Sequence, residues 1–136
     1  MFTNIACELE KTVYILKSKR LKVFRENPFP VSKDQWLILQ NISEKKDCNQ
    51  SEIAQAIFKE PAAITRMIDT LVNKGFVQRK RTLKDRRVFK IELTVEGNRL
   101  VRRMTPELEE IETGFESRLS KRQKHELIDL LQALQG

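Results

Sequence analysis

The sequence has few of the residues on which small disulfide-bonded, metal-binding and nucleotide-binding proteins depend. It contains two cysteines, one histidine and four glycines in 136 residues. These numbers exclude a disulfide framework, disfavour a histidine-based metal or catalytic cluster and leave no glycine-rich phosphate loop. The longest stretch without a charge lies between Asp34 and Glu44, much shorter than the ~20 apolar residues of a membrane span. No apolar signal segment follows the N-terminus. We therefore expect a cytoplasmic protein with no cofactor, no metal and no membrane contact.

The positive charge of the chain is concentrated in one segment. The formal net charge is +7. Residues 74–103 contain eleven basic and three acidic side chains, so this segment carries +8 and the rest of the chain −1. A charged segment alone is often only a solvated surface. Beside a nucleic-acid-binding motif, however, it indicates a polyanionic partner.

Apolar periodicity predicts a mainly α-helical chain. Ser32, Asn49 and Ser120 each precede a Gln or Glu three positions later, the pattern of a capping box at a helix start. Pro61 suits the first turn of another helix, where its missing N–H costs nothing. The spacing of apolar residues predicts helices over about residues 4–25, 32–44, 49–57, 61–74, 94–118 and 120–134.

The period changes after the fourth predicted helix. Gly75 stands where a left-handed helix end is expected. Residues 76–79 and 87–93 then alternate between apolar and polar side chains, which predicts two strands of a hairpin joined by the long basic loop 80–86. Pro106 lies inside the helix that follows and is expected to kink it.

The predicted order of helix, three-residue turn, helix and basic hairpin is typical of a winged helix-turn-helix. In this motif the second helix enters the major groove, and the hairpin, or wing, reaches the adjacent minor groove or backbone. Small side chains near the start of that helix allow close approach to the bases, and an arginine can bond guanine or clamp a phosphate. The residues expected on this exposed face are Ala62, Ala63, Thr65, Arg66 and Asp69.

Five short motifs follow one another at a regular spacing through the predicted DNA-binding region. They are Gln50–Ala54, Pro61–Arg66, Leu71–Arg79, Asp85–Arg87 and Leu93–Gly97. Their order and spacing resemble the MarR family of bacterial winged-helix regulators, and the resemblance covers almost the whole chain. The Asp85-Arg-Arg87 element, followed by Leu93-Thr94 and Gly97, is its most specific part.

The resemblance implies one MarR-like domain over residues 1–136. Within it, about residues 32–97 form the DNA-binding lobe, and about 4–25 and 98–136 form interlocking dimerisation helices. Apolar stripes on both terminal segments fit such an interface. The implied function is that of a homodimeric, sequence-specific regulator of transcription, usually a ligand-responsive repressor, on a pseudopalindromic operator. An effector would occupy the cleft between the dimerisation helices and the lobe.

The resemblance also assigns roles to residues of the hairpin and helix. Arg87 matches a wing arginine that enters the minor groove, and Asp85 matches an acid that orients it through a salt bridge. Pro61, Ala62, Thr65 and Arg66 fall on positions that touch bases or phosphates. The full set of candidate DNA-binding residues is Pro61, Ala62, Ala63, Thr65, Arg66, Arg79, Lys84, Asp85, Arg86 and Arg87.

Other functions remain open at this point. Cys7 lies roughly where peroxide-sensing relatives keep a reactive cysteine, but those relatives surround it with tyrosines. Here Tyr14 is the one tyrosine, and the neighbouring acids Glu8 and Glu10 disfavour a thiolate. A winged helix can also serve only for protein–protein assembly, although such a module has no need of the basic segment. No set of residues with catalytic spacing is present, so an enzyme is not expected.

Overall fold

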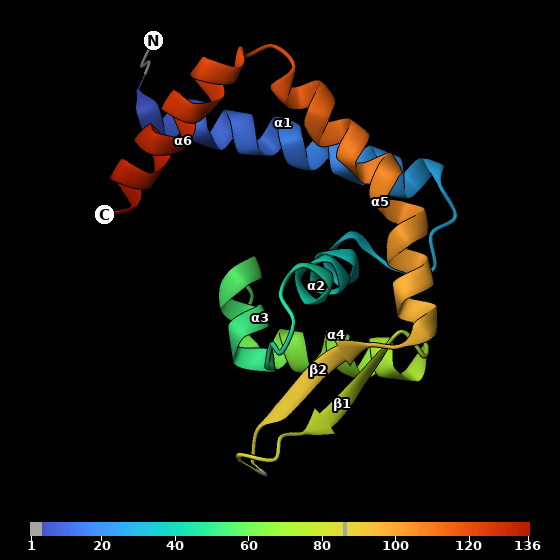
Figure 1. Ribbon diagram of the computed structural model, residues 1–136. Helices are drawn as coiled ribbons and strands as arrows, with labels where there is room; N and C mark the ends of the chain where they lie inside the picture. Colours follow the sequence, from blue (N-terminus) through green and yellow to red (C-terminus); the bar gives the residue numbers. More distant parts are fainter. Residues whose placement is uncertain (1–3, 86) are drawn as a thin grey trace. The chain divides into compact units, whose positions relative to one another are not determined.

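The computed structural model describes residues 4–85 and 87–136 of the chain. Within them, the chain forms six α-helices and one two-stranded antiparallel sheet (Figure 1), which confirms the predicted fold class. In chain order the elements are α1 (Ile5–Glu26), α2 (Lys33–Glu44), α3 (Gln50–Ile57), α4 (Pro61–Asn73), β1 (Val77–Arg81), β2 (Phe89–Leu93), α5 (Val95–Glu116) and α6 (Lys121–Gln135).

The helices begin where the capping residues predicted them to begin. Three of the helices begin with a capping box. In each box, the side chain of the cap residue accepts a hydrogen bond from the backbone N–H three residues later, and the side chain of that later residue accepts a hydrogen bond from the backbone N–H of the cap residue. These reciprocal bonds satisfy donors that the first turn leaves unpaired. The pairs are Ser32 with Gln35, Asn49 with Glu52 and Ser120 with Gln123.

The end of α4 is fixed by a glycine. Gly75 has a φ of +83°, a left-handed conformation that glycine adopts without steric penalty. Its N–H donates to Val72 O at 3.0 Å, and the Phe76 N–H donates to Leu71 O at 3.0 Å. This pair of bonds closes the helix as a Schellman motif and turns the chain directly into β1.

The hairpin is regular but its strands differ from the predicted ranges. Val77 pairs with Leu93, and the register continues to Arg81 opposite Phe89. The first strand begins one residue later and ends two residues later than predicted, and the second begins two residues later. The reason is that the limits of both strands are set by their pairing, whereas the alternation of apolar and polar residues is a property of each strand alone. Asn49 adds an isolated antiparallel bridge to Lys90.

The chain divides into two compact units. One is Phe24–Thr105, and the other joins the first helix up to Val23 with Pro106–Gly136. The first unit contains the whole predicted lobe and the first three turns of α5, which continues through Pro106. The kink expected at Pro106 stays a prediction. The core of this unit is made by apolar side chains of α2, α3, α4, both strands and α5, among them Trp36, Ile38, Leu39, Ile53, Ile64, Ile68, Leu71, Val77, Ile91 and Met104.

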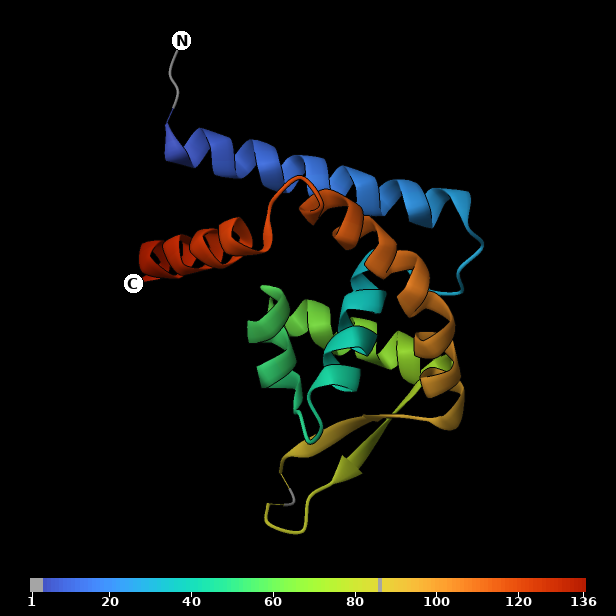
Figure 2. The same ribbon diagram turned by 45° about the horizontal axis from the view of Figure 1, so that its top comes forward.

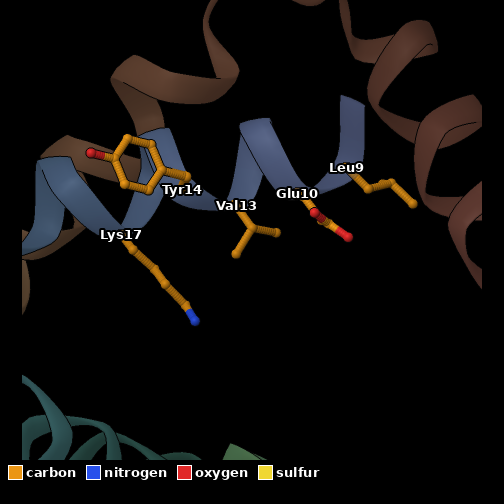
Figure 3. Close-up of a pocket in the computed structure, with 5 residues that line it drawn as sticks. All are labelled: Leu9, Glu10, Val13, Tyr14 and Lys17. Atoms are coloured by element: carbon orange, nitrogen blue, oxygen red, sulfur yellow. The ribbon is translucent and has the colours of Figure 1, made fainter. Parts of the chain in front are cut away.

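In the second unit, α1 and α6 leave much apolar surface exposed. Arg20 of α1 pairs with Glu112, and Lys19 lies over the Phe115 ring. In contrast, apolar side chains of α1 and α6 line an open groove, and none of the described residues of these helices is buried. A second hollow on α1 is lined by Leu9, Val13 and Tyr14 beside charged neighbours (Figure 3). The groove residues include Ile5, Leu9, Leu127, Leu130, Leu131 and Leu134.

None of the helices in residues 4–85 and 87–136 combines the length and apolar character of a membrane span.

Candidate nucleic-acid interface

Helices α3 and α4 form the predicted helix-turn-helix. The turn is Phe58–Glu60, and Phe58 adopts a left-handed conformation with a φ of +56°. Its N–H donates to Ala54 O and so closes α3. Pro61 occupies the first position of α4, as predicted, although Glu60 makes no side-chain cap. The antiparallel hairpin follows immediately, and Figures 1 and 2 show its loop reaching beyond α4.

The two faces of α4 differ sharply. Ile64, Ile68 and Leu71 are fully buried, which anchors the helix on the core through i, i+4 and i+7 contacts. The opposite face is exposed and carries Pro61, Ala62, Thr65, Arg66 and Asp69.

Ala63 differs from the expectation that it shares the exposed face. It is half-buried and lines a hollow with Asp34, Arg66 and Met67. The reason is its position directly before Ile64, on the flank of the helix rather than at its outer side. The Arg66 guanidinium has no bonded partner within the described part of the chain, since only its backbone carbonyl is used, by the Thr70 hydroxyl.

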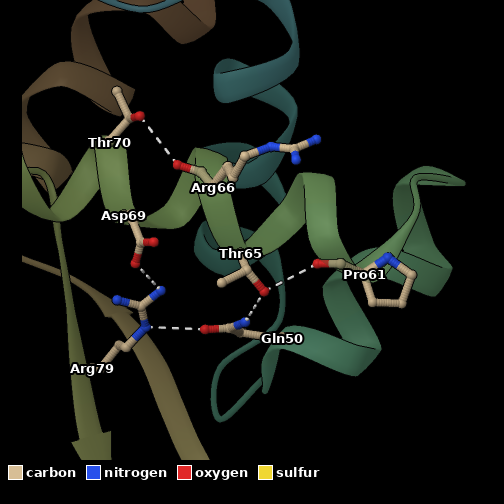
Figure 4. Close-up of polar contacts among 7 residues, drawn as sticks. All are labelled: Gln50, Pro61, Thr65, Arg66, Asp69, Thr70 and Arg79. Carbon is tan, nitrogen blue, oxygen red and sulfur yellow. Dashed lines mark hydrogen bonds and ion pairs between the residues drawn. The ribbon is translucent and has the colours of Figure 1, made fainter.

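A polar network crosses the helix-turn-helix and ends on the hairpin (Figure 4). Arg79 of β1 forms an ion pair with Asp69 of α4 at 2.6 Å, and its Nε donates to Gln50 Oε1 at 3.0 Å. Gln50 Nε2 in turn donates to Thr65 Oγ1 at 3.1 Å. Arg79 is therefore held by protein groups. Sequence reasoning missed Gln50, which belongs to the first turn of α3 and carries no signal of a distant partner.

The loop of the wing is organised around Asp85. The Thr82 hydroxyl donates to Asp85 O at 2.7 Å and accepts from the Asp85 N–H at 3.2 Å. The Asp85 carboxylate accepts the backbone N–H of Arg87 at 2.9 Å, as short acidic side chains do in turns. This differs from the expected salt bridge, because within the described residues the carboxylate contacts no guanidinium. Lys84 and Arg87 are exposed, and Arg86 lies outside the described residues.

Several basic side chains of segment 74–103 have partners within the protein. Lys74 donates a hydrogen bond to Pro30 O at 2.7 Å, and Lys80 forms an ion pair with Glu92 at 2.8 Å. The Lys80 hydrogen bond holds the pKa of Glu92 below its ordinary value. Lys90 pairs with Asp47 and in the same way lowers the pKa of that carboxyl.

Among the residues that the structure describes, fewer cations of this segment than the sequence indicated lack both an ion pair and a hydrogen bond from the side chain. Arg81 lies over the Phe89 ring, with 5.6 Å from its guanidinium carbon to the ring centroid. Lys84 and Arg87 lie on the loop of the wing, and Arg102 and Arg103 on α5. The free charge beside α4 is therefore concentrated on the outer half of the hairpin.

The two cysteines occupy different environments. Cys48 is fully buried, its carbonyl accepts the Ile91 N–H at 2.9 Å, and burial raises the pKa of its thiol. Cys7 is exposed on α1. Among residues 4–85 and 87–136, no three His, Cys, Asp or Glu side chains lie together as a metal site would require.

Comparison with known proteins agrees with this geometry. Residues 31–89 match the model of the MarR family. A curated relative, the uncharacterized HTH-type transcriptional regulator YhbI of Bacillus subtilis (strain 168), is 27% identical over 116 residues, which cover 85% of this chain and 75% of the relative.

Solved structures of the same fold cover nearly the whole chain. The DNA complex of S. aureus MepR has a TM-score of 0.82 at 20% identity and covers 98% of this chain and 97% of its own. The structure of Bordetella bronchiseptica BpsR, whose DNA binding is regulated by 6-hydroxynicotinic acid, has a TM-score of 0.82 at 17% identity. The match covers 97% of this chain and 93% of the BpsR chain. The chain thus has a winged helix-turn-helix fold, and its residues 31–89 are similar to the MarR family of transcriptional regulators.

Proposed function

We propose that the protein is a sequence-specific, double-stranded DNA-binding regulator of transcription. The observation that carries this proposal is the exposed face of α4 beside a wing with free cations. Ala62 is small, Arg66 offers an unoccupied guanidinium, and Lys84 and Arg87 stand exposed on the neighbouring loop. On such a surface, α4 offers hydrogen-bond donors to the edges of the bases. The neighbouring wing offers positive charge to the phosphates.

The wing and α4 contribute differently to DNA binding. The wing supplies much of the affinity, because Lys84, Arg87 and Arg81 displace counterions from the duplex without reading its sequence. Helix α4 supplies more of the sequence choice, because its outer face is nearly neutral and Arg66 can form a bidentate pair with guanine. We include Arg86 with the wing from sequence alone.

We further propose that the protein acts as a homodimer. The apolar groove residues of α1 and α6 lie open to solvent in one chain, which is the kind of surface that a second copy covers. A twofold dimer presents two α4 helices about 34–36 Å apart, one turn of the duplex. The operator is then a pseudopalindrome.

Control by a small molecule is the remaining part of the proposal. The DNA binding of BpsR is regulated by 6-hydroxynicotinic acid, and we infer that this chain responds to an effector of its own as a repressor. The proposed place of action is the cytoplasm, since a regulator must share a compartment with the bacterial chromosome.

The experiment that tests this proposal is the selection of bound duplexes from a random pool. We expect enrichment of one motif with two inverted half-sites about one turn apart, and a much weaker affinity for a scrambled duplex of equal length. A pool that stays random after repeated selection, or equal affinity for the selected and scrambled duplexes, contradicts sequence-specific binding.

A further inference from the structure

One arginine of the hairpin is bonded to both helices of the helix-turn-helix. Arg79 lies on β1, its ion-pair partner Asp69 lies on α4, and its hydrogen-bond partner Gln50 lies on α3 (Figure 4). The fork of the guanidinium allows both contacts at once, with separate nitrogens at 2.6 Å and 3.0 Å. A lysine, with one nitrogen, cannot reproduce this geometry.

Arg79 begins a series of hydrogen bonds in which each side chain donates to the next residue. Arg79 Nε donates to Gln50, Gln50 Nε2 donates to the Thr65 hydroxyl, and Thr65 donates to Pro61 O at 3.1 Å. Both ends of the Gln50 amide are used, so its orientation is fixed, and bonds in such a chain polarise one another. The chain ends on the first residue of α4, the end of that helix that faces a duplex.

The same bonds occupy polar groups of two residues that the sequence predicted to contact DNA. The Arg79 side chain is 25% exposed and already neutralised by Asp69. The one hydroxyl hydrogen of Thr65 is donated to Pro61, so this residue keeps only its methyl group and a lone pair for a base. Arg66, one position further, has its guanidinium free.

We propose that Arg79 is a positioning residue, which sets the placement of α4 against the hairpin and so controls discrimination between DNA sequences rather than contact with phosphate. This inference rests on the proposed DNA-binding function. Its physical basis is that base-edge contacts need α4 to be held accurately in the groove, whereas phosphate contacts tolerate small displacements.

Asp69 provides the sharpest way to separate this role from phosphate binding. Its carboxylate is on the exposed face of α4, with 55% of the side chain exposed. If Arg79 clamped a phosphate, Asp69 would compete with the duplex for it, and Asp69→Asn would strengthen binding. If Arg79 positions α4 through Asp69, the same variant weakens specific binding instead.

The experiment measures the affinity of the full chain for its selected duplex and for a scrambled duplex over a range of salt concentrations. The variants are Arg79→Gln, Asp69→Asn and their combination, with thermal unfolding to check that each folds. Arg81→Gln is the matched control, because it removes the same charge from the same face of β1 at a residue without a carboxylate partner in the described chain.

We expect Arg79→Gln and Asp69→Asn each to weaken binding to the selected duplex about tenfold or more, the scale of one charge-assisted hydrogen bond. Binding to the scrambled duplex and the salt dependence stay close to those of the wild type. The double variant loses little more than either single one, because the two residues share one interaction. Arg79→Lys, which keeps the pair with Asp69 and loses Gln50, is intermediate.

Four outcomes overturn the inference. Equal losses on both duplexes with a smaller salt dependence, as for Arg81→Gln, make Arg79 a phosphate contact. Stronger binding by Asp69→Asn has the same meaning. Unchanged affinities in both variants leave the network without a role in recognition. A wild-type protein that binds both duplexes equally refutes the proposed function itself, and this inference with it.

Discussion

The contact of α5 with the end of α4 depends on the absence of one side chain. Gly97 lies in the first turn of α5 and is buried. A Cβ at this position would stand 2.0 Å from the Phe76 carbonyl oxygen and 3.0 Å from its carbon. Ordinary contact begins at 3.4 Å, so Gly97→Ala must separate two backbone segments by about 1.4 Å.

The separation disturbs the bonds that join α5 to the turn after α4. Thr94 donates from its N–H to Phe76 O at 3.0 Å and from its hydroxyl to Gly75 O at 2.6 Å. Overpacking costs about 1–3 kcal/mol, two weakened hydrogen bonds cost about 1–3 kcal/mol, and alanine returns about 1 kcal/mol of helix propensity. We expect Gly97→Ala to lower the free energy of unfolding by about 1–5 kcal/mol.

Gly114→Ala is the matched control, since it makes the same change in the same helix. A Cβ there would meet nothing within 4 Å, so this variant should gain up to about 1 kcal/mol. Urea unfolding followed by circular dichroism measures both. If Gly97→Ala proves neutral, or stabilises the chain as Gly114→Ala does, the close approach of α5 to Phe76 is not a feature of the folded protein.

The remaining predictions concern recognition, assembly and pH. Arg66→Ala should cost about 1–3 kcal/mol of binding if this residue reads a base, and equal losses on selected and scrambled duplexes would make it a phosphate contact. Removal of the chain after Ser120 should give monomers in light scattering, because it deletes the apolar face of α6, and a persistent dimer would refute that role. Lys80 lowers the pKa of Glu92 in the folded protein, so the unfolded chain binds more protons as the pH falls through the acid range, and stability falls with it. Thermal unfolding at neutral and acid pH should therefore show a smaller loss for Glu92→Gln than for the wild type, and equal losses would contradict the contribution of this pair.

The features that the sequence predicted well depend on residues close together in the chain. A capping box joins residues three positions apart, and the left-handed end of α4 needs only Gly75 after an apolar stripe. The strand limits depended on a partner strand, and here the prediction was wrong by two residues at each inner end. Strand pairing, which draws Lys80 and Arg81 into β1, has no such local signal.

The role of a basic side chain was harder to predict, because composition gives its charge and not its partner. The sequence predicts that Arg79 contacts DNA with the rest of the basic segment, yet its partner Gln50 is 29 residues away. Lys74 and Lys80 belong to the same segment and are likewise bonded within the protein. The sequence thus predicts a polyanion-binding region, and only the fold separates the cations that are bonded within the protein from those that we propose contact a duplex.

The central claim is that this chain recognises a particular duplex through α4 and holds it through the wing. It is tested most directly by the salt dependence of binding to the selected duplex, for the wild type and for Arg87→Ala. The account predicts weaker binding by the variant and a salt slope smaller by about one counterion, with the wild type strongly preferring the selected duplex to a scrambled one. Unchanged affinity and slope in Arg87→Ala would contradict the role of the wing, and absence of that preference would contradict recognition altogether.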